Sequence, residues 1–326
     1  MRVLVTGASG FLGSHIAEKF AKEGHEVRTL LREASSRQFL QFPHEEAIGD
    51  ITDASSLHSA VTGVDVVVHS AGLIMARSDA EFASVNEHGT TNLYRAIEAH
   101  NPDIRRIVYI SSIAAHGASK SDRARPVDAP PRPVTAYGRS KLAGELLARR
   151  SSLGKRTVTF RPPAIYGPHD PALLPFFQLA RYRVIPMLAG GKNRVSMVYA
   201  TDIAGAVYVA ATAEADIGAR IYCPEDGVVH TWLDMLSAVE KATGKKMFKL
   251  PTPRIFYDAV AMGSEAVGAV TRRPVIFTRD KVREMSQNAW ICSAADLQRD
   301  LGWKAEVGIT EGARLTYDWY REAGWL

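Results

Sequence analysis

The segment VLVTGASGFLG, Val3–Gly13, joins a short β-branched run to a helical pattern that extends from about residue 14 to residue 23. Between the two patterns lie three evenly spaced glycines, Gly7, Gly10 and Gly13. The first N–H groups of a helix lack intrahelical partners and the helix dipole favours an anion there, while glycines let the backbone approach a pyrophosphate closely. The segment therefore predicts a dinucleotide-binding turn, and a tight turn without a ligand is the alternative.

The first half of the chain alternates strand patterns with helical patterns. A second strand is expected at 25–31, and continuous apolar strands of the kind that is buried on both faces follow at 65–71, 106–112 and 157–163. Helical patterns lie near 80–100 and 136–150. This alternation predicts an α/β fold, a Rossmann-type doubly wound parallel sheet with right-handed crossovers.

The pattern changes after Pro162, where prolines and glycines become frequent. A strand-then-helix pattern returns at 194–212, and the chain is mostly helical from about His230. We expect a dinucleotide-binding domain at 1–165 plus about 201–229. A smaller, mostly helical substrate-binding region is expected at about 166–200 plus 230–326.

Composition narrows the class of protein further. The 326 residues are 46% hydrophobic, and no apolar run approaches the roughly 20 residues that cross a bilayer. The apolar start is too short for a secretory signal, so a cytoplasmic protein is expected. Lys and Arg are dispersed despite a net charge of +5, which argues against nucleic-acid binding. Cys223 and Cys292 lack metal-ligand spacing and are interpreted as free thiols, so no metal site is expected.

The end of the second strand bears on the choice of cofactor. Leu31 occupies the strand end, Arg32 follows it, and Ser35 and Ser36 come shortly after. A cation and hydroxyl groups suit a 2′-phosphate better than a free 2′-hydroxyl, which favours NADP(H). Glu33 is able to accept a ribose hydrogen bond, so NAD(H) stays open.

Three further residues are candidates for catalysis. Tyr137 and Lys141 are four residues apart on a predicted helix and therefore share one face, and Ser112 closes the strand at 106–112. An ammonium group beside a phenol stabilises phenolate, which allows tyrosine to act as a general acid or base toward an alcohol or carbonyl oxygen. A serine hydroxyl can hydrogen-bond the same oxygen as charge develops.

Ordered motifs along essentially the whole chain resemble those of the extended short-chain dehydrogenase/reductase family. They are TGASGFLG (6–13), GDITD (49–53), HSAG (69–72), VNEHGT (85–90), YISSIAAHG (109–117), AYGRSK (136–141) and RPPAIYGP (161–168). The resemblance implies a catalytic triad of Ser112, Tyr137 and Lys141, with Asn86 in support. It also implies a homodimer.

The same resemblance assigns the cofactor contacts, with Pro162 beside the nicotinamide. The implied cofactor-binding residues are Gly7, Ser9, Gly10, Phe11, Leu12, Gly13, Arg32, Asp50, Ile51, Ser70, Ala71, Gly72, Tyr137, Lys141, Pro162 and Ile165. His69 is interpreted as a structural residue at the end of a strand.

Departures from the family's motifs separate its chemistries. Sugar dehydratases of this family carry an Asp-Glu pair where Ile113 and Ala114 follow Ser112 here, so dehydration is disfavoured. Nucleotide-sugar epimerases typically have Asn where this chain has Ala164. They also place a diphosphate-binding Arg where this chain has Val195, although the neighbouring Arg194 is able to substitute.

The motifs of this chain resemble those of 3β-hydroxysteroid dehydrogenase-like and dihydroflavonol reductase-like members more closely than those of the sugar-modifying members. We therefore expect an NAD(P)-dependent oxidoreductase that interconverts a hydroxyl and a ketone on a mainly apolar small molecule of steroid-like or flavonoid-like class. The alternative is a nucleotide-sugar 4-epimerase with tightly bound NAD. A third hypothesis, a non-catalytic dinucleotide sensor, does not need the triad.

One apolar stripe has three interpretations. Eight apolar residues recur at helical spacing before Arg272 and Arg273: Ile255, Phe256, Ala259, Val260, Met262, Ala266, Val267 and Val270. The stripe is expected to pack on its own domain. The alternatives are a lid over an apolar pocket and a helix that rests on a membrane surface.

Overall fold

The main sheet has seven parallel strands in the order β10-β6-β5-β4-β1-β2-β3. The computed structural model describes residues 1–187, 191–275 and 277–326. The strands are β1 Arg2–Thr6, β2 Glu26–Leu31, β3 Glu45–Ile48, β4 Val66–His69, β5 Arg106–Ile110, β6 Thr157–Phe160 and β10 Ile221–Tyr222. The predicted Rossmann-type parallel sheet is confirmed.

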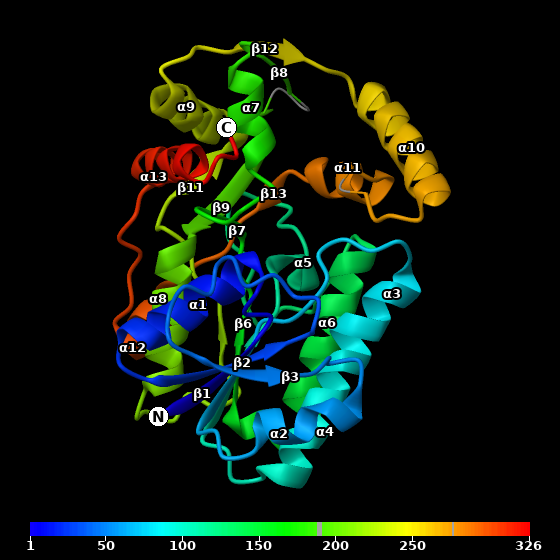
Figure 1. Ribbon diagram of the computed structural model, residues 1–326. Helices are drawn as coiled ribbons and strands as arrows, with labels where there is room; N and C mark the ends of the chain where they lie inside the picture. The colour runs from blue at the N-terminus through cyan, green and yellow to red at the C-terminus, as the bar shows by residue number, and fades with distance from the viewer. Residues whose placement is uncertain (188–190, 276) are drawn as a thin grey trace.

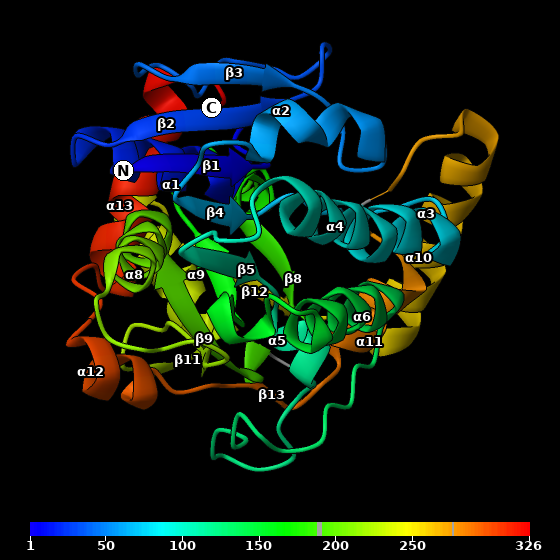
Figure 2. The same cartoon turned by 90° about the horizontal axis from the view of Figure 1, so that it is seen from below.

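Helices cover both faces of this sheet (Figure 2). The helices α1 Phe11–Lys22 and α8 Ala200–Thr212 pack on one face, and α2 His58–Val61, α4 Thr90–His100 and α6 Ala136–Arg150 pack on the other. Side chains alternate along a strand, so Val3 and Val5 of β1 join the core beneath α1 and α8, while Leu4 joins the core beneath α4. Both faces of β1 are therefore buried away from solvent, which explains its unbroken apolar sequence.

Several predicted boundaries move. The first helix begins at Phe11 rather than residue 14, because Gly10 already has the extended backbone of an N-cap. The helix expected at 80–100 consists of α3 Asp79–Ala83, a π-helical turn η2 Ser84–Gly89, and α4. The strand expected at 157–163 ends at Phe160, before two prolines that cannot donate to a ladder.

A smaller layer lies beyond the carboxyl ends of the main strands (Figure 1). Its central strand β9 Arg194–Tyr199 pairs with β7 Ala164–Tyr166, β11 Val229–Thr231 and β13 Ala289–Trp290. The helices α7 Leu174–Ala180, α9 Trp232–Thr243 and α13 Ile309–Glu322 share its core. We propose that the chain divides as expected, with 1–165 plus about 201–229 around the main sheet and 166–200 plus 230–326 on the substrate side.

The remaining elements are short segments and one long helix. They are η1 Ala54–Leu57, α5 Ile113–His116, η3 Gly154–Arg156, β8 Val184–Met187, β12 Phe248–Pro251, α10 Arg254–Thr271, α11 Arg279–Met285 and α12 Ala295–Leu301. The strands β8 and β12 form a separate two-stranded ribbon. Within 1–187, 191–275 and 277–326, no helix is long and apolar enough to span a membrane.

The apolar stripe of α10 faces away from the protein. All eight of its residues are exposed, with Ile255 at 76% and Val270 at 85% exposure. The expectation that the stripe packs on its own domain is therefore wrong. The helix packs instead through Tyr257, Ala261 and Gly268, which lie on its opposite side.

Candidate active site

A cavity of about 830 Å³ opens at the carboxyl ends of β1 and β4. These two strands meet where the strand order reverses, which is the usual ligand site of an open α/β sheet. Every residue that the sequence assigned to the cofactor lies on the wall of this cavity, from Gly7 and Arg32 to Pro162 and Ile165. The sequence thus predicted residues that the fold brings together from six separate segments.

The glycine turn is packed against its neighbours as well as open to the cavity. Gly7 has φ of +73°, and a Cβ on it would lie 2.7 Å from the Ala71 nitrogen. A Cβ on Gly13 would lie 2.1 Å from the Gly7 carbonyl oxygen. Only bare backbone fits here, and the first N–H groups of α1 are left at the cavity wall, as pyrophosphate binding requires.

The residues after β2 lie at one end of the same cavity. Arg32 and Ser35 line the wall, and the Ser35 hydroxyl accepts a hydrogen bond from the Arg32 N–H at 3.1 Å. Arg37 is bound by Glu46 through two hydrogen bonds, of 3.1 and 2.9 Å, whereas the Arg32 guanidinium has no ion-pair partner among the described residues. Glu33 is not on the cavity wall. The cavity wall therefore carries, next to the end of β2, a cation without an ion-pair partner in the described part of the chain.

His69 organises the end of β4 and belongs to the framework. Its ring contacts the hydroxyl of Thr6 at 2.8 Å and that of Thr90 at 3.0 Å, and so joins β1, β4 and α4. Complete burial lowers the pKa of His69 to about 3, with a smaller effect of the Lys141 charge. The ring is therefore neutral, and the Thr6 hydroxyl holds the Ala71 N–H at the cavity edge.

Ser112 and Tyr137 come together from two helix starts. Ser112 caps α5, with its hydroxyl accepting the Ala114 N–H at 3.1 Å, and Tyr137 lies in the first turn of α6. Burial raises the pKa of Tyr137 to about 12, while a hydrogen bond with Ser112 opposes the rise. The phenol is therefore protonated at neutral pH, as an ordinary tyrosine also is.

Lys141 lies one turn further along α6 and reaches the same cavity. Its ammonium donates to the Ile110 carbonyl at 2.6 Å, and its Nζ lies 5.0 Å from the centre of the Tyr109 ring. Burial lowers the pKa of Lys141 to about 8, and Glu145 partly restores it. The effect of Lys141 on the Tyr137 pKa stays a prediction, because the forces that shift that pKa here are burial, Ser112 and Glu284.

Asn86 is not on the cavity wall and supports it from behind. Its amide accepts the Leu73 N–H at 2.8 Å and donates to the Leu73 carbonyl at 3.0 Å and the Ser140 hydroxyl at 2.9 Å. These bonds connect the segment after β4 to the residue that precedes Lys141. Asn86 lies in the π-helical turn η2 and acts as a positioning residue.

A second cavity, of about 1080 Å³, meets the first at Ser112 and Tyr137. Its apolar wall includes Ile74, Met75, Phe82, Ala269 and Val275. Charged side chains from α10, α11 and the segment between them also line it. The Ser112 and Tyr137 side chains therefore line both cavities, and the second cavity extends from them toward α10.

Sequence reasoning missed part of the cofactor cavity. Phe39, His169 and Trp325 line it, although they are far apart in the chain. The Phe39 and His169 rings stack with centroids 3.9 Å apart, and the Phe39 and Trp325 centroids are 6.4 Å apart. No motif marks such residues, because aromatic side chains are equally frequent in ordinary cores.

The fold and this arrangement define a class of protein, the dinucleotide-dependent enzymes with a Ser-Tyr-Lys site. The family comparison makes the assignment specific. The model of the NAD dependent epimerase/dehydratase family matches residues 3–222, and the chain belongs to this family. It is an enzyme, an oxidoreductase of the extended short-chain dehydrogenase/reductase type.

Individual relatives agree with that assignment. Ceramide reductase from Caulobacter vibrioides is 33% identical over 328 residues, covering 99% of this chain and 96% of the relative. A 4-hydroxy-2-methyl-3-oxo-4-farnesyl-3,4-dihydroquinoline-1-oxide ketoreductase from Stigmatella aurantiaca is 30% identical, covering 70% of this chain and 69% of the relative. The structure of the UDP-glucose 4-epimerase of Thermus thermophilus in complex with NAD has a TM-score of 0.79 and 27% identity, covering 99% of this chain and 100% of that one.

Proposed function

We propose that the protein is an NADP(H)-preferring ketoreductase that acts on a mainly apolar small molecule. The observation that carries this proposal is the junction of the two cavities at Ser112 and Tyr137. One cavity holds every residue expected at the dinucleotide, and the other combines an apolar wall with charged side chains from α10, α11 and the segment between them. The names of the two reductase relatives, one with a ceramide and one with a farnesyl substrate, support a lipid-like ketone.

The proposed chemistry assigns one task to each polar residue. The bound cofactor supplies the hydride. Tyr137 donates its proton to the carbonyl oxygen as that oxygen gains charge, and Ser112 donates a hydrogen bond to the same oxygen. Reduction needs a protonated phenol, and Tyr137 is in that form at neutral pH. Lys141, held by the Ile110 carbonyl, keeps a positive charge near the developing oxyanion.

The test is Tyr137→Phe, which removes the proton donor and leaves the ring. We expect reduction of a long-chain ketone to fall by about 10²- to 10⁴-fold while NADPH affinity is kept. Ketone turnover and NADPH fluorescence titration measure the two quantities. Tyr208→Phe is the matched control, since Tyr208 lies on α8 and lines neither cavity. Wild-type turnover in the Tyr137 variant would contradict the mechanism.

The alternative function, a nucleotide-sugar 4-epimerase, has less support than ketone reduction from the residues at the expected diphosphate-binding positions. Arg194, the substitute for the diphosphate-binding arginine, is paired with Asp122 and lines neither cavity. Val195 is buried in the core of the smaller sheet. The similarity to UDP-glucose 4-epimerase keeps the question testable. Thermal stabilisation by UDP or a UDP-sugar, together with co-purified NAD, would favour epimerisation over ketone reduction.

We propose in addition a homodimer in the cytoplasm, on the resemblance and composition given above. Light scattering of the purified protein tests the proposed homodimer, and cell fractionation tests the proposed location.

Within the described residues no group of three or more His, Cys, Asp or Glu side chains is arranged to bind a metal ion. The proposed chemistry assigns no role to a metal.

A further inference from the structure

The helix α10 has its amphipathic character reversed relative to an ordinary surface helix. Six large apolar side chains form its outward face: Ile255, Phe256, Val260, Met262, Val267 and Val270. The ionisable side chains of the helix form ion pairs and lie on another side of it. Arg254 pairs with Asp258 at 3.4 Å, and Glu265 binds Arg279 at 2.8 Å. At 3.6 residues per turn, the outward face contains no charged residue.

The β8–β12 ribbon, which precedes α10 in the chain, also carries exposed apolar side chains. Phe248 is 66% exposed, and Val184 and Leu250 are also exposed on the same ribbon. Phe248 pairs with Val184 across the two strands, so their side chains point to the same face. The ribbon leads directly into α10, and both lie at the end of the molecule away from the main sheet (Figure 1). The two elements together are called the apolar platform.

Basic residues lie in the segments that form the apolar platform and precede it. The segments 181–187 and 245–254 contain no Asp or Glu, and their basic residues are Arg181, Arg183, Lys245, Lys246, Lys249 and Arg254. Two of these six are ion-paired, Lys249 with Glu240 at 3.6 Å and Arg254 with Asp258. The exposed Arg272 and Arg273 follow the last turn of α10 and have no ion-pair partner in the described part of the chain. An apolar face bordered by Lys and Arg complements an anionic lipid surface, whereas a protein partner requires no such excess of one sign.

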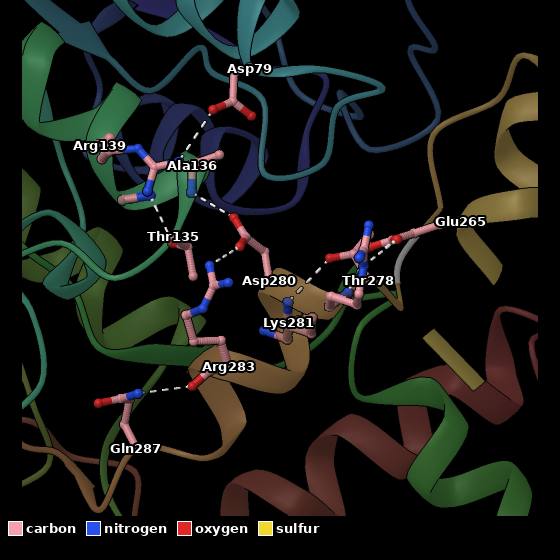
Figure 3. A network of polar contacts seen from close by, with 12 residues as sticks. Asp79, Thr135, Ala136, Arg139, Glu265, Thr278, Asp280, Lys281, Arg283 and Gln287 are labelled. Atoms are coloured by element: carbon pink, nitrogen blue, oxygen red, sulfur yellow. Dashed lines mark hydrogen bonds and ion pairs between the residues drawn. The ribbon is translucent and has the colours of Figure 1, made fainter. Parts of the chain in front are cut away.

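The platform is joined to the catalytic centre. Gly268 and Ala269 of α10, and Arg272 and Arg273 after it, line the same cavity as Tyr137. Figure 3 shows the polar contacts that hold the two parts together. Glu265 binds the backbone N–H of Arg279 at 2.8 Å, and the neighbouring Asp280 accepts the Ala136 N–H at 2.7 Å, one residue before Tyr137.

We propose that the apolar platform docks on an anionic lipid bilayer and that the second cavity receives its substrate from that bilayer. The helix lies in the interface, with its outward side chains among the acyl chains and the arginines among the headgroups. Docking itself depends only on the surface. The delivery of substrate rests on the proposed ketoreductase function, so the two parts are tested separately.

The first experiment is co-flotation of the full-length protein with vesicles. The vesicles contain phosphatidylcholine alone or with about one third phosphatidylglycerol. We expect binding to the anionic vesicles to be stronger by on the order of tenfold and to weaken as salt is added. The double variant Ile255→Ser/Val270→Ser should lose about tenfold in binding, and its thermal midpoint should stay unchanged because both side chains are exposed.

The matched control is Val228→Ser/Val229→Ser, which removes two exposed valines near β11 and should bind as wild type does. Equal binding of wild type and the α10 variant would overturn the proposal, as would absence of binding to anionic vesicles. A wild-type dimer that the α10 variant converts to monomers, seen by light scattering, would also overturn it, because the platform would then cover a second copy.

The second experiment compares two ketones, one short-chain and water-soluble and one long-chain and embedded in the vesicles. In the α10 variant we expect turnover of the soluble ketone to be kept and turnover of the embedded ketone to fall about tenfold. Equal effects on both ketones would overturn substrate delivery. If wild type binds vesicles and reduces neither ketone, the proposed function fails and docking stands.

Discussion

At the scale of single residues, Asp170 is a carboxyl group in an unfavourable environment. It is 4% exposed at the cavity wall, and burial raises its pKa to about 6 although the Ala172 and Leu173 N–H groups oppose the rise. Its Oδ1 accepts the Ala172 N–H at 2.8 Å. The unfolded chain ionises this group near pH 4, so between about pH 4 and pH 6 the folded state holds a proton that the unfolded state has lost. Stability must therefore fall as pH rises through this window.

Asp170→Asn should remove that fall, because an amide keeps the Oδ1 acceptor and does not ionise. We expect the variant to match wild type near pH 4 and to exceed it by about 3 kcal/mol above pH 6, from a shift of about two pKa units. Urea unfolding at both pH values measures the difference. Asp103→Asn is the control, since the Asp103 side chain is 98% exposed. Parallel pH profiles for wild type and Asp170→Asn would contradict the assignment.

Arg32 is the residue on which the cofactor preference depends. Because its guanidinium is free of ion pairs within the described chain and lines the cofactor cavity, Arg32→Ala should weaken NADPH by about tenfold and NADH by much less. Fluorescence titration of both cofactors measures the two affinities. Arg37→Ala is the control, since Glu46 already binds that guanidinium. Equal losses of NADPH and NADH would exclude a role at the 2′-phosphate.

Residues in recognisable motifs were the most predictable from sequence. Ser112, Tyr137 and Lys141 line one cavity, as their motifs led us to expect, while their catalytic roles stay a prediction. His169 and Trp325 were not predicted, because their position at the cavity depends on how distant segments pack. Glu145 was also missed. It is fully buried and binds Arg161 at 2.6 and 3.0 Å, and nothing in the local sequence of α6 indicates this partner.

At the scale of elements, the start of α1 is limited by backbone contact. Gly13→Ala places a Cβ 2.1 Å from the Gly7 carbonyl oxygen, which forces the glycine turn to open. We expect a loss of about 2 kcal/mol or more in unfolding free energy and a loss of cofactor binding. Gly263→Ala is the matched control inside α10, where a new Cβ meets nothing within 4 Å. That variant should gain about 0.5–1 kcal/mol from helix propensity. Denaturant unfolding of both variants checks the prediction, and a tolerated Gly13→Ala would refute it.

Periodicity predicted which residues share a face of an element but not what that face meets. The spacing of Ile255, Met262 and Val270 identified a helix stripe correctly, yet the stripe faces outward. The apolar pattern of 80–100 predicted a helix but not the π-helical turn within it. One extra residue per turn does not change the composition of the segment, so the sequence does not indicate it. The strand β3 was not predicted, because its exposed Glu45 and Glu46 reflect an edge position in the sheet.

At the scale of the whole molecule, Asp280 connects the substrate side to the catalytic helix. Its carboxylate accepts the Ala136 N–H, which is one of the unpaired donors at the start of α6. We expect Asp280→Ala to lower the unfolding free energy by about 1–3 kcal/mol and to lower kcat/KM several-fold, because the turn that carries Tyr137 keeps its Thr135 cap but loses the acceptor of the Ala136 N–H. Thermal unfolding and steady-state kinetics measure the two effects. Asp296→Ala, which removes only an exposed pair with Arg299, is the control. Unchanged kcat/KM in Asp280→Ala would show that the contact does not position Tyr137.

The parallel sheet and its flanking helices were predictable because strands buried on both faces leave continuous apolar runs, as at Val66–His69. The contacts between the main sheet and the substrate side were not. Asp280 and Ala136 are 144 residues apart, and their hydrogen bond depends on the path of α10 and α11 between them. Such a contact follows from the completed packing rather than from any local pattern.

The position of β10 at the end of the sheet has a consequence for biosynthesis. Ile221 of β10 pairs with Thr159 of β6. In the chain, both α8, which packs against α1, and β10 come after the strands β7 and β9 of the other layer. When only the first 165 residues have left the ribosome, the face of α1 that α8 later covers, with Phe20 among its residues, therefore still lacks its partner helix. Contacts between segments so far apart in sequence form late, and until then the nascent chain exposes apolar surface to which chaperones can bind.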